Sequence, residues 1–409
     1  MTNLLWPGDH RAGEHMTDQA LLQSMVAVES AWLRALSAAG LAPVDCAGAD
    51  LWHLVGEHDC EPLALTAEDG GNPVIGLVAL LRQRTVPAIA PWIHRGLTSQ
   101  DVLDTSLMLG VRAVVNHLMA QLSEQISTLS ALAATHRATP MVARTLTQHA
   151  APTTFGAKAA SWLNGVVDAL AQLSALATPV QIGGAVGTWS ATSELATLMT
   201  GAANPAEVVD HVVRSTATAL GLDTRLPWHT TRTPVTAAAD AFLGCTDCWG
   251  RIASDVVTLV RPEIAELSEP ATEKRGESSS MPHKRNPVLS ILIRRAAISA
   301  PQLAATLHTA AALANDERPD GSWHAEWDTL RTLARRTVVA GSQCGELLAG
   351  LGVHAEQMAE NLSAADILGE QRAIADLVGK APSATYFGAI DRLIDESLDR
   401  AQWILKEHP

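Results

Sequence analysis

A polar loop in the second half of the chain carries the residue types best suited to proton-transfer chemistry. Residues 276–287 read Gly-Glu-Ser-Ser-Ser-Met-Pro-His-Lys-Arg-Asn-Pro, so three serine hydroxyls precede the cations Lys284 and Arg285. Asn286 followed by Pro287 is typical of a helix N-cap and the first helical residue. A serine can move a proton to or from carbon only where cations and backbone amides lower its pKa. The loop is therefore either a proton-transfer site of this kind or a flexible polar linker.

Two more polar segments precede predicted helices and contain more hydroxyl and amide groups than a helix cap requires. Thr98, Ser99, Gln100 and Asp101 precede one helix, and Thr98 and Asp101 have the spacing of a capping box. Residues 144–154 precede another helix. Helix N-termini bind carboxylates, because their free amides and the helix dipole attract anions. If the three N-termini converge, they could hold a di- or tricarboxylate; if they do not, they are ordinary caps.

The composition favours an all-α fold built on a bundle of long helices. Of the 409 residues, 47% are hydrophobic but only 4% are aromatic, and alanine and leucine, which favour helices, recur throughout. Helices that are apolar over much of their circumference need partners on several sides, which indicates a bundle that also packs against other subunits. Apolar residues at helical spacing predict long helices over residues 101–136, 153–179, 234–268, 287–314 and 326–351. The predicted domains are a mixed-helical N-terminal domain, the bundle and a short helical C-terminal domain, over residues 1–100, 101–351 and 352–409.

Charge and cysteine content limit the classes of partner and cofactor. The formal net charge is −14 and no basic run is present, so nucleic acids and anionic membranes are poor partners. No signal peptide or membrane-spanning apolar stretch is recognisable, which predicts a cytoplasmic protein. The five cysteines are an odd number without framework spacing, as expected of reduced thiols. Cys245 and Cys248 form a lone CxxC within a helical segment, so we expect no metal site and no cofactor.

The loop sequence SSSMPHKRNP closely resembles the signature loop of the fumarase/aspartase superfamily, and residues 98–101 and 144–154 resemble its two other conserved blocks. The resemblance covers nearly the whole chain. It implies three mostly helical domains and a homotetramer whose active sites each draw on several subunits. It also implies that Ser278, at the family's fixed offset from Lys284, is the catalytic serine that removes or returns a proton on the carbon next to a carboxylate.

Two substitutions indicate the branch of the superfamily. Leu146 replaces the histidine that usually follows the threonine of the second block, and Ile291 replaces the glutamate that usually orients this histidine. Together with residues 70–78 and the Trp-rich element 323–327, these substitutions resemble the bacterial 3-carboxy-cis,cis-muconate cycloisomerases. The reaction implied is the reversible lactonisation of 3-carboxy-cis,cis-muconate to 4-carboxymuconolactone in protocatechuate catabolism, the β-ketoadipate pathway, by proton transfer and carboxylate addition. The alternatives are an adenylosuccinate-type lyase that releases fumarate and a non-catalytic structural oligomer of the same fold.

The resemblance also implies roles for residues around the serine. His149, three positions after Leu146, is the second candidate for proton transfer, or else it binds a substrate carboxylate. Arg318 and Arg232 match family blocks and either pair with carboxylates or brace the bundle. The predicted substrate-binding residues are Thr98, Ser99, Gln100, Thr147, Gln148, Lys284, Asn286 and Arg318. Two features depart from the family: Glu277 stands where a second glycine is usual, and the segment after Asn361 is shorter than usual.

Overall fold

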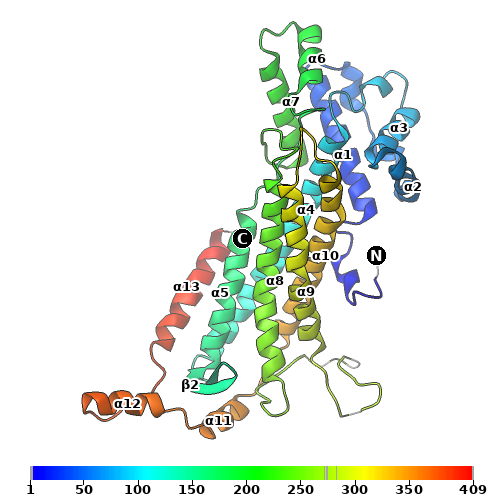
Figure 1. Cartoon of the computed structure of the whole chain (residues 1–409). Coiled ribbons are helices and arrows are strands. Elements are labelled where there is room, and N and C mark those ends of the chain that lie inside the picture. Colours follow the sequence, from blue (N-terminus) through cyan, green and yellow to red (C-terminus); the bar gives the residue numbers. More distant parts are fainter. Residues whose placement is uncertain (1–2, 271, 273–274, 282, 408–409) are drawn as a thin grey trace. The chain divides into compact units, whose positions relative to one another are not determined.

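The structure, a computed structural model, confirms the all-α prediction (Figure 1). It describes residues 3–270, 272, 275–281 and 283–407. The chain forms two compact units. Unit 1 comprises Met1–Asn116, Leu176–Asp240 and Gln302–Arg335, and unit 2 comprises His117–Ala175, Ala241–Pro301 and Arg336–Pro409. The division into three consecutive domains stays a prediction.

Four long helices supply residues to both units, and each lies close to a range predicted from apolar spacing. They are α4 (Ser99–Thr135), α8 (Thr233–Leu259), α9 (Val288–Ala312) and α10 (Gly321–Ala349). Their buried positions are mostly alanine, valine, leucine and isoleucine, which pack between helices without unpaired polar groups. The predicted range 234–268 extends too far, because α8 ends at Leu259 and a loop follows. The range 326–351 begins too late, because α10 starts at Gly321.

Unit 1 also contains a group of shorter helices around α1. Thr17 caps α1, because its hydroxyl accepts a hydrogen bond from the amide of Ala20 at 3.2 Å. Helix α1 buries Trp32 and Leu36 and packs against α7. The helices of this group are α1 (Asp18–Ala38), α2 (Cys60–Gly70), α3 (Val74–Arg84), α6 (Ser190–Thr200) and α7 (Pro205–Leu220).

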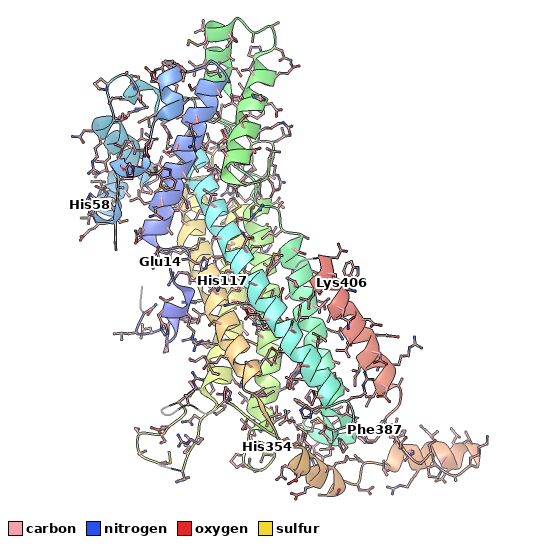
Figure 2. The ribbon with its side chains drawn as sticks, turned by 180° about the vertical axis from the view of Figure 1, so that it is seen from behind. Glu14, His58, His117, His354, Phe387 and Lys406 are labelled. Carbon is pink, nitrogen blue, oxygen red and sulfur yellow. The ribbon has the colours of Figure 1, made fainter. Side chains whose placement is uncertain are left out.

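Unit 2 contains α5 (Phe155–Ser174) and the C-terminal helices. Helix α13 (Ile390–Glu407) runs along α5, and its Ile394 is buried against alanines of α4 and α5. Figure 2 shows Lys406 near the end of α13 and His354 just before α11. The remaining helices of the C-terminal segment are α11 (Ala355–Ser363) and α12 (Gly369–Val378). A two-stranded ladder pairs β3 (Leu267–Ser268) with β4 (Gly352–Val353).

The segment before α5 differs from the prediction of a helix from residue 153. It forms an antiparallel hairpin of β1 (Pro140–Thr145) and β2 (Gln148–Thr154), and α5 starts only at Phe155. Leu146 and Thr147 connect the strands with φ angles of 47° and 73°, as expected for a two-residue hairpin turn. Apolar spacing identified α5 but does not identify turns. The usual sequence sign of a two-residue turn is also missing, because neither Leu146 nor Thr147 is glycine or asparagine.

Helix α9 bears on the expectation that no segment is long and apolar enough to span a membrane. In the described part of the chain it is the one helix that meets this criterion by length and composition. Only 33% of its most apolar stretch is buried within the chain, and Ile291 and Ile298 are 48% and 71% exposed. A single helix of this kind is weak evidence for a membrane segment, because core helices of soluble proteins meet the same criterion. What the described residues show is that α9 has an apolar face that they leave largely uncovered.

Candidate active site

The serine loop of unit 2 is held by hydrogen bonds that converge on the predicted catalytic serine. The Ser278 hydroxyl oxygen accepts hydrogen bonds from the amides of Met281 at 3.1 Å and Ser280 at 3.4 Å. The amide of Lys284 donates to the Met281 carbonyl at 3.0 Å. Donors aimed at an oxygen favour its deprotonated form, so this turn suits a serine that must act as a base. Pro282, part of the family signature, lies outside the described residues.

The cations of this loop differ in their partners. The Lys284 side chain is exposed and forms no hydrogen bond or ion pair with the described residues, whereas Arg285 contacts Glu277. A cavity of about 550 Å³ adjoins the loop and is lined in part by Ser268, Arg275, Arg285 and Asn286, whereas Ser278 and Lys284 are not among its lining residues. Among the described residues, Lys284 is therefore the loop cation without an ion-pair partner.

The N-terminus of α9 is already occupied by a protein carboxylate. Glu269 accepts hydrogen bonds from the amides of Leu289 at 3.0 Å and Ser290 at 2.7 Å, and from the Ser290 hydroxyl at 2.6 Å. The prediction that Asn286 caps this helix is therefore wrong. Its side-chain amide donates instead to the Gly276 carbonyl at 3.1 Å and braces the loop. A role of Asn286 in substrate binding stays a prediction.

The predicted residues of the second block lie at the tip of the hairpin. Thr147, Gln148 and His149 are exposed, and the Gln148 amide donates to the Thr147 hydroxyl at 3.1 Å. No carboxylate of the described residues orients the His149 ring. Strand β1 is anchored by Arg144, which forms two hydrogen bonds with the buried Glu266, at 2.7 and 3.0 Å. The hairpin thus presents a row of polar side chains on a fixed base.

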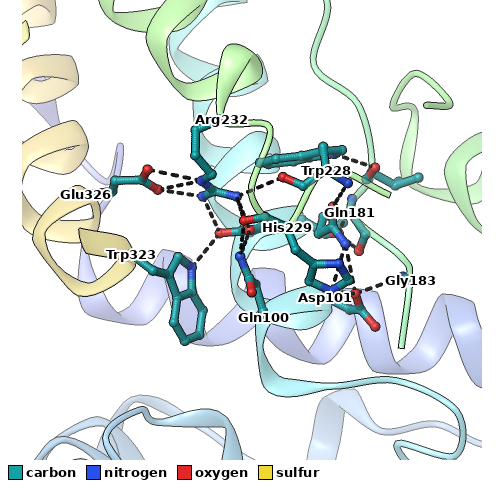
Figure 3. Close-up of polar contacts among 12 residues, drawn as sticks. Gln100, Asp101, Gln181, Gly183, Trp228, His229, Arg232, Trp323 and Glu326 are labelled. Carbon is teal, nitrogen blue, oxygen red and sulfur yellow. Dashed lines mark hydrogen bonds and ion pairs between the residues drawn. The ribbon is translucent and has the colours of Figure 1, made fainter. Parts of the chain in front are cut away.

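In unit 1, the start of α4 is organised around the buried Asp101 (Figure 3). Its carboxylate accepts hydrogen bonds from the amides of Thr98 at 3.0 Å and of Gly183 and Gly184 at 2.9 Å. The Gln181 side-chain amide also donates to it, at 3.1 Å. One of the two hydrogen bonds of the predicted capping box is present: the Asp101 carboxylate accepts a hydrogen bond from the backbone amide of Thr98. The hydroxyls of Thr98 and Ser99 have no hydrogen-bond partner among the described residues, and substrate binding by both residues stays a prediction.

A fully buried ion cluster lies one turn further along α4 (Figure 3). Arg232 donates to Asp104 at 2.7 and 3.0 Å and to Glu326 at 3.1 Å. Burial alone would lower the pKa of Arg232, but the two carboxylates outweigh it and raise this pKa. Burial also raises the pKa of Glu326, against the opposing effect of Arg232. Arg232 does pair with carboxylates, but they belong to the chain itself, so in this structure the pairing joins α4 and α10 and braces the helices.

Gln100, a predicted substrate-binding residue, belongs to this buried cluster. Its side-chain amide donates to Asp104 at 3.1 Å and to the His229 carbonyl at 2.9 Å. Its side-chain oxygen is buried without a hydrogen-bond partner in the described part of the chain. Arg318 is partly buried and makes no ion pair with described residues. Substrate binding by both residues stays a prediction, and for Gln100 the observed contacts are structural.

The sequence analysis missed a carboxylate–imidazole pair next to the start of α4. The His94 ring nitrogen Nδ1 lies 2.6 Å from the fully buried carboxylate of Glu29, which also accepts the His94 amide at 3.0 Å. His94 has a φ of 60°, a left-handed conformation that a non-glycine residue adopts at some cost. The signal available in the sequence was the position of Glu29, a charged residue inside the apolar run of α1 (Asp18–Ala38).

The predicted residues thus fall into two groups. Unit 2 brings together Ser278, Lys284 and Asn286 in one loop, and Thr147, Gln148 and His149 in the hairpin. Unit 1 contains Thr98, Ser99, Gln100 and Arg318. Among the described residues, no group of three or more His, Cys, Asp or Glu side chains is arranged to hold a metal ion.

Comparison with known proteins agrees with the loop and the fold. A family profile described as "Lyase" matches residues 64–301. A nitrosuccinate lyase of Streptomyces davaonensis is 44% identical over 399 residues, which span 94% of this chain and 82% of the relative. A 3-carboxy-cis,cis-muconate cycloisomerase of Bradyrhizobium diazoefficiens is 39% identical over 376 residues, 89% of this chain and 80% of the relative. The crystal structure of the 3-carboxy-cis,cis-muconate lactonizing enzyme from Pseudomonas putida has a TM-score of 0.80 at 29% identity, covering 96% of this chain and 97% of that one. The chain belongs to the fumarase/aspartase superfamily of lyases.

Proposed function

We propose that the chain eliminates a weakly basic anion from a succinate-type dicarboxylate, and that nitrosuccinate is its substrate. A base removes a proton from the methylene carbon of nitrosuccinate, next to the distal carboxylate. The electron pair of the broken C–H bond forms the new C=C bond. The C–N bond breaks, and nitrite leaves with its electron pair. Nitrosuccinate is thereby converted to fumarate, nitrite and a proton, with no change in net oxidation state.

The observation that carries this proposal is the pair of apolar side chains at the positions of the missing histidine and glutamate. Leu146 is 95% exposed at the hairpin tip and Ile291 is 48% exposed on α9 (Val288–Ala312). Neither side chain has a group that can donate a proton. Amines and alkoxides are strong bases and need a general acid to leave. Nitrite is the conjugate base of nitrous acid, which is a far stronger acid than an ammonium ion or an alcohol, so nitrite can leave without a general acid. The substitutions therefore favour a substrate with a weakly basic leaving group.

The serine loop supplies the other requirements of the reaction. Removing the methylene proton places negative charge on the adjacent carboxylate, and this charge needs donors that are already in place. The amides of Ser280 and Met281 stabilise the deprotonated form of Ser278, the proposed base. The ammonium group of Lys284, six residues further along the same loop, has no ion-pair partner among the described residues and is suited to the carboxylate that gains charge. His149 is proposed as a second carboxylate-binding group.

The test is turnover of nitrosuccinate by the purified protein. Nitrite is measured by diazo coupling, and fumarate by its ultraviolet absorbance, and the two must appear in equal amounts. Ser278→Ala should lower kcat by at least about a hundredfold, because a positioned proton-transfer group contributes a factor of about a hundred to ten thousand. Ser279→Ala is the matched control, because it removes a neighbouring hydroxyl and should retain most of the activity. A folded wild-type protein that releases no nitrite would refute the proposal.

A second candidate is 3-carboxy-cis,cis-muconate cycloisomerase activity. Residues 70–78 and 323–327 resemble that branch, and several relatives carry this name. Read backwards, lactonisation also expels a weakly basic anion, a carboxylate, so Leu146 and Ile291 are compatible with it. Loss of the diene absorbance of 3-carboxy-cis,cis-muconate, with a higher kcat/KM than for nitrosuccinate, would favour this function instead. The missing His–Glu pair argues against an adenylosuccinate-type lyase, and any turnover that depends on Ser278 excludes a purely structural oligomer.

We also propose that the protein is a cytoplasmic homotetramer. The resemblance to the superfamily implies the tetramer, and the exposed apolar face of α9, which includes Ile291 and Ile298 and which the described residues leave uncovered, supports association of copies of the chain. Burying such a face against copies of the chain would remove apolar surface from water. Light scattering coupled to size-exclusion chromatography measures the mass directly, and a monomeric mass at micromolar concentration would contradict the proposal.

A further inference from the structure

The serine loop has a narrow neck where its two ends approach. The amide of Asn286 donates to the Gly276 carbonyl at 2.8 Å, and Gly276 has a φ of 78°. A Cβ atom at position 276 would lie 2.5 Å from the Asn286 carbonyl oxygen, closer than real contacts allow. The two backbone segments therefore meet as closely as glycine permits.

Glu277 and Arg285 form the next pair along this neck. Their backbones make an antiparallel bridge, and a guanidinium nitrogen of Arg285 lies 3.3 Å from the Glu277 carboxylate. The side chains are 52% and 64% exposed, so this ion pair is accessible to salt and is weak compared with a buried pair. The two residues thus add a charge contact directly above the backbone contact of Gly276 and Asn286.

This pair borders the two residues that the proposed reaction needs. Ser278 directly follows Glu277, and Lys284 directly precedes Arg285. Closing the neck fixes the backbone on both sides and therefore limits where the serine hydroxyl and the ammonium group can lie. The pair also occupies Arg285, which leaves Lys284 as the unpaired cation of the loop among the described residues.

We propose that Glu277 is a positioning residue: its ion pair with Arg285 holds the neck closed and keeps Ser278 and Lys284 in their working arrangement. This proposal rests on the proposed function of the serine loop. It accounts for the acidic residue at a position where glycine is usual in the superfamily. Glycine would leave the neck held by the backbone contact alone, and Arg285 without its carboxylate partner.

Kinetics of charge variants test the proposal. Glu277→Gln and Arg285→Gln should each lower kcat about two- to fivefold, the range that an exposed ion pair can contribute, with a smaller change in KM. The double variant Glu277→Gln with Arg285→Gln should be no worse than either single variant, because both remove the same interaction. The charge-swapped variant Glu277→Arg with Arg285→Glu should recover most of kcat, and wild-type kcat should fall with added salt more than that of Glu277→Gln.

The matched control is an ion pair of similar exposure that is remote from the loop in sequence. Arg214 and Asp210 on α7 (Pro205–Leu220) are 2.7 Å apart and 63% and 46% exposed. Arg214→Gln should leave kcat unchanged. Full activity of Glu277→Gln, or a charge-swapped variant as impaired as the single ones, would overturn the proposal. If Ser278→Ala abolishes turnover in the same series, the proposed function stands even where the proposed role of Glu277 is overturned.

Limited trypsin digestion gives a readout that needs no substrate. Lys284 and Arg285 are cleavage sites inside the loop, and cleavage requires the neck to open. Glu277→Gln should speed cleavage at these two sites about two- to fivefold and leave cleavage elsewhere unchanged. Faster cleavage supports the ion-paired neck even if nitrosuccinate is not turned over, a result that would refute the proposed function alone. Equal cleavage rates for wild type and Glu277→Gln would overturn the proposal that the ion pair holds the neck closed.

Discussion

Replacing Arg232 by methionine tests the role of the buried ion cluster in unit 1. Arg232 is 2% exposed and its guanidinium group bonds to both Asp104 and Glu326. The cluster holds one cation and two carboxylates, and the variant would leave two carboxylates with no cation. Methionine fills much of the same volume, so the main loss is electrostatic. Removing one partner of a buried ion pair costs about 3–5 kcal/mol, and we expect a loss of unfolding free energy in this range.

The loss should depend on pH in a defined direction. Burial already raises the pKa of Glu326 although Arg232 opposes the shift. Without Arg232, the folded-state pKa of this carboxyl rises further above its unfolded value, so folding then takes up a proton. A raised carboxyl pKa destabilises the folded state as pH rises through it and ceases to do so at low pH. The deficit of Arg232→Met should therefore be largest near about pH 8 and smaller near about pH 5.

The assay is denaturant unfolding of wild type and variant at both pH values, with the midpoint and slope compared. Arg251→Met is the control, because Arg251 also pairs with an aspartate, Asp255, but is 55% exposed. An exposed pair contributes at most about 1 kcal/mol, with little pH dependence in this range. An Arg232→Met deficit no larger than that of Arg251→Met would refute the argument, as would a deficit that grows as pH falls.

Three further predictions concern single positions. Gly276→Ala should lower kcat at least about tenfold while the melting temperature stays within about 2 °C, because the clash is confined to the loop neck; unchanged kcat would contradict the neck geometry. Glu29→Gln should lower the unfolding free energy by about 1–3 kcal/mol in denaturant titrations, because it weakens buried hydrogen bonds to His94. Burial raises the pKa of the Cys245 thiol, so this cysteine should resist a thiol reagent until the protein unfolds, and fast labelling of native protein, located by mass spectrometry, would contradict its burial.

Local sequence patterns predicted the long helices well, because helical burial repeats along the chain. The spacing of apolar residues identified α4, α8, α9 and α10, with errors only at the ends. The hairpin before α5 was missed, because its turn residues Leu146 and Thr147 adopt left-handed conformations without the usual glycine or asparagine. The family signature identified the serine loop, and the structure adds the amide contacts around Ser278.

Contacts between distant residues were beyond the reach of these patterns. Asn286 has the sequence environment of a helix cap, yet Glu269, which is well upstream of α9, provides the cap. Arg232 meets Asp104 across 128 positions, and Glu29 meets His94 across 65. A charged residue inside an apolar helical stretch is the one local sign of such contacts. It indicates that a partner exists without naming it.

The capped helix N-termini change the account of how a substrate with several carboxylates is bound. The sequence suggested that three helix N-termini could hold it with few full positive charges. Glu269 accepts two amides at the start of α9, and the Thr154 hydroxyl accepts the Ala157 amide at the start of α5. At α4 the Asp101 carboxylate accepts the amide of Thr98, the residue just before the helix. Amides that already have acceptors attract an anion only weakly. For the proposed dicarboxylate substrate we therefore expect recognition to depend more on side-chain cations such as Lys284, which has no ion-pair partner among the described residues, in a protein whose net charge of −14 otherwise repels such a substrate.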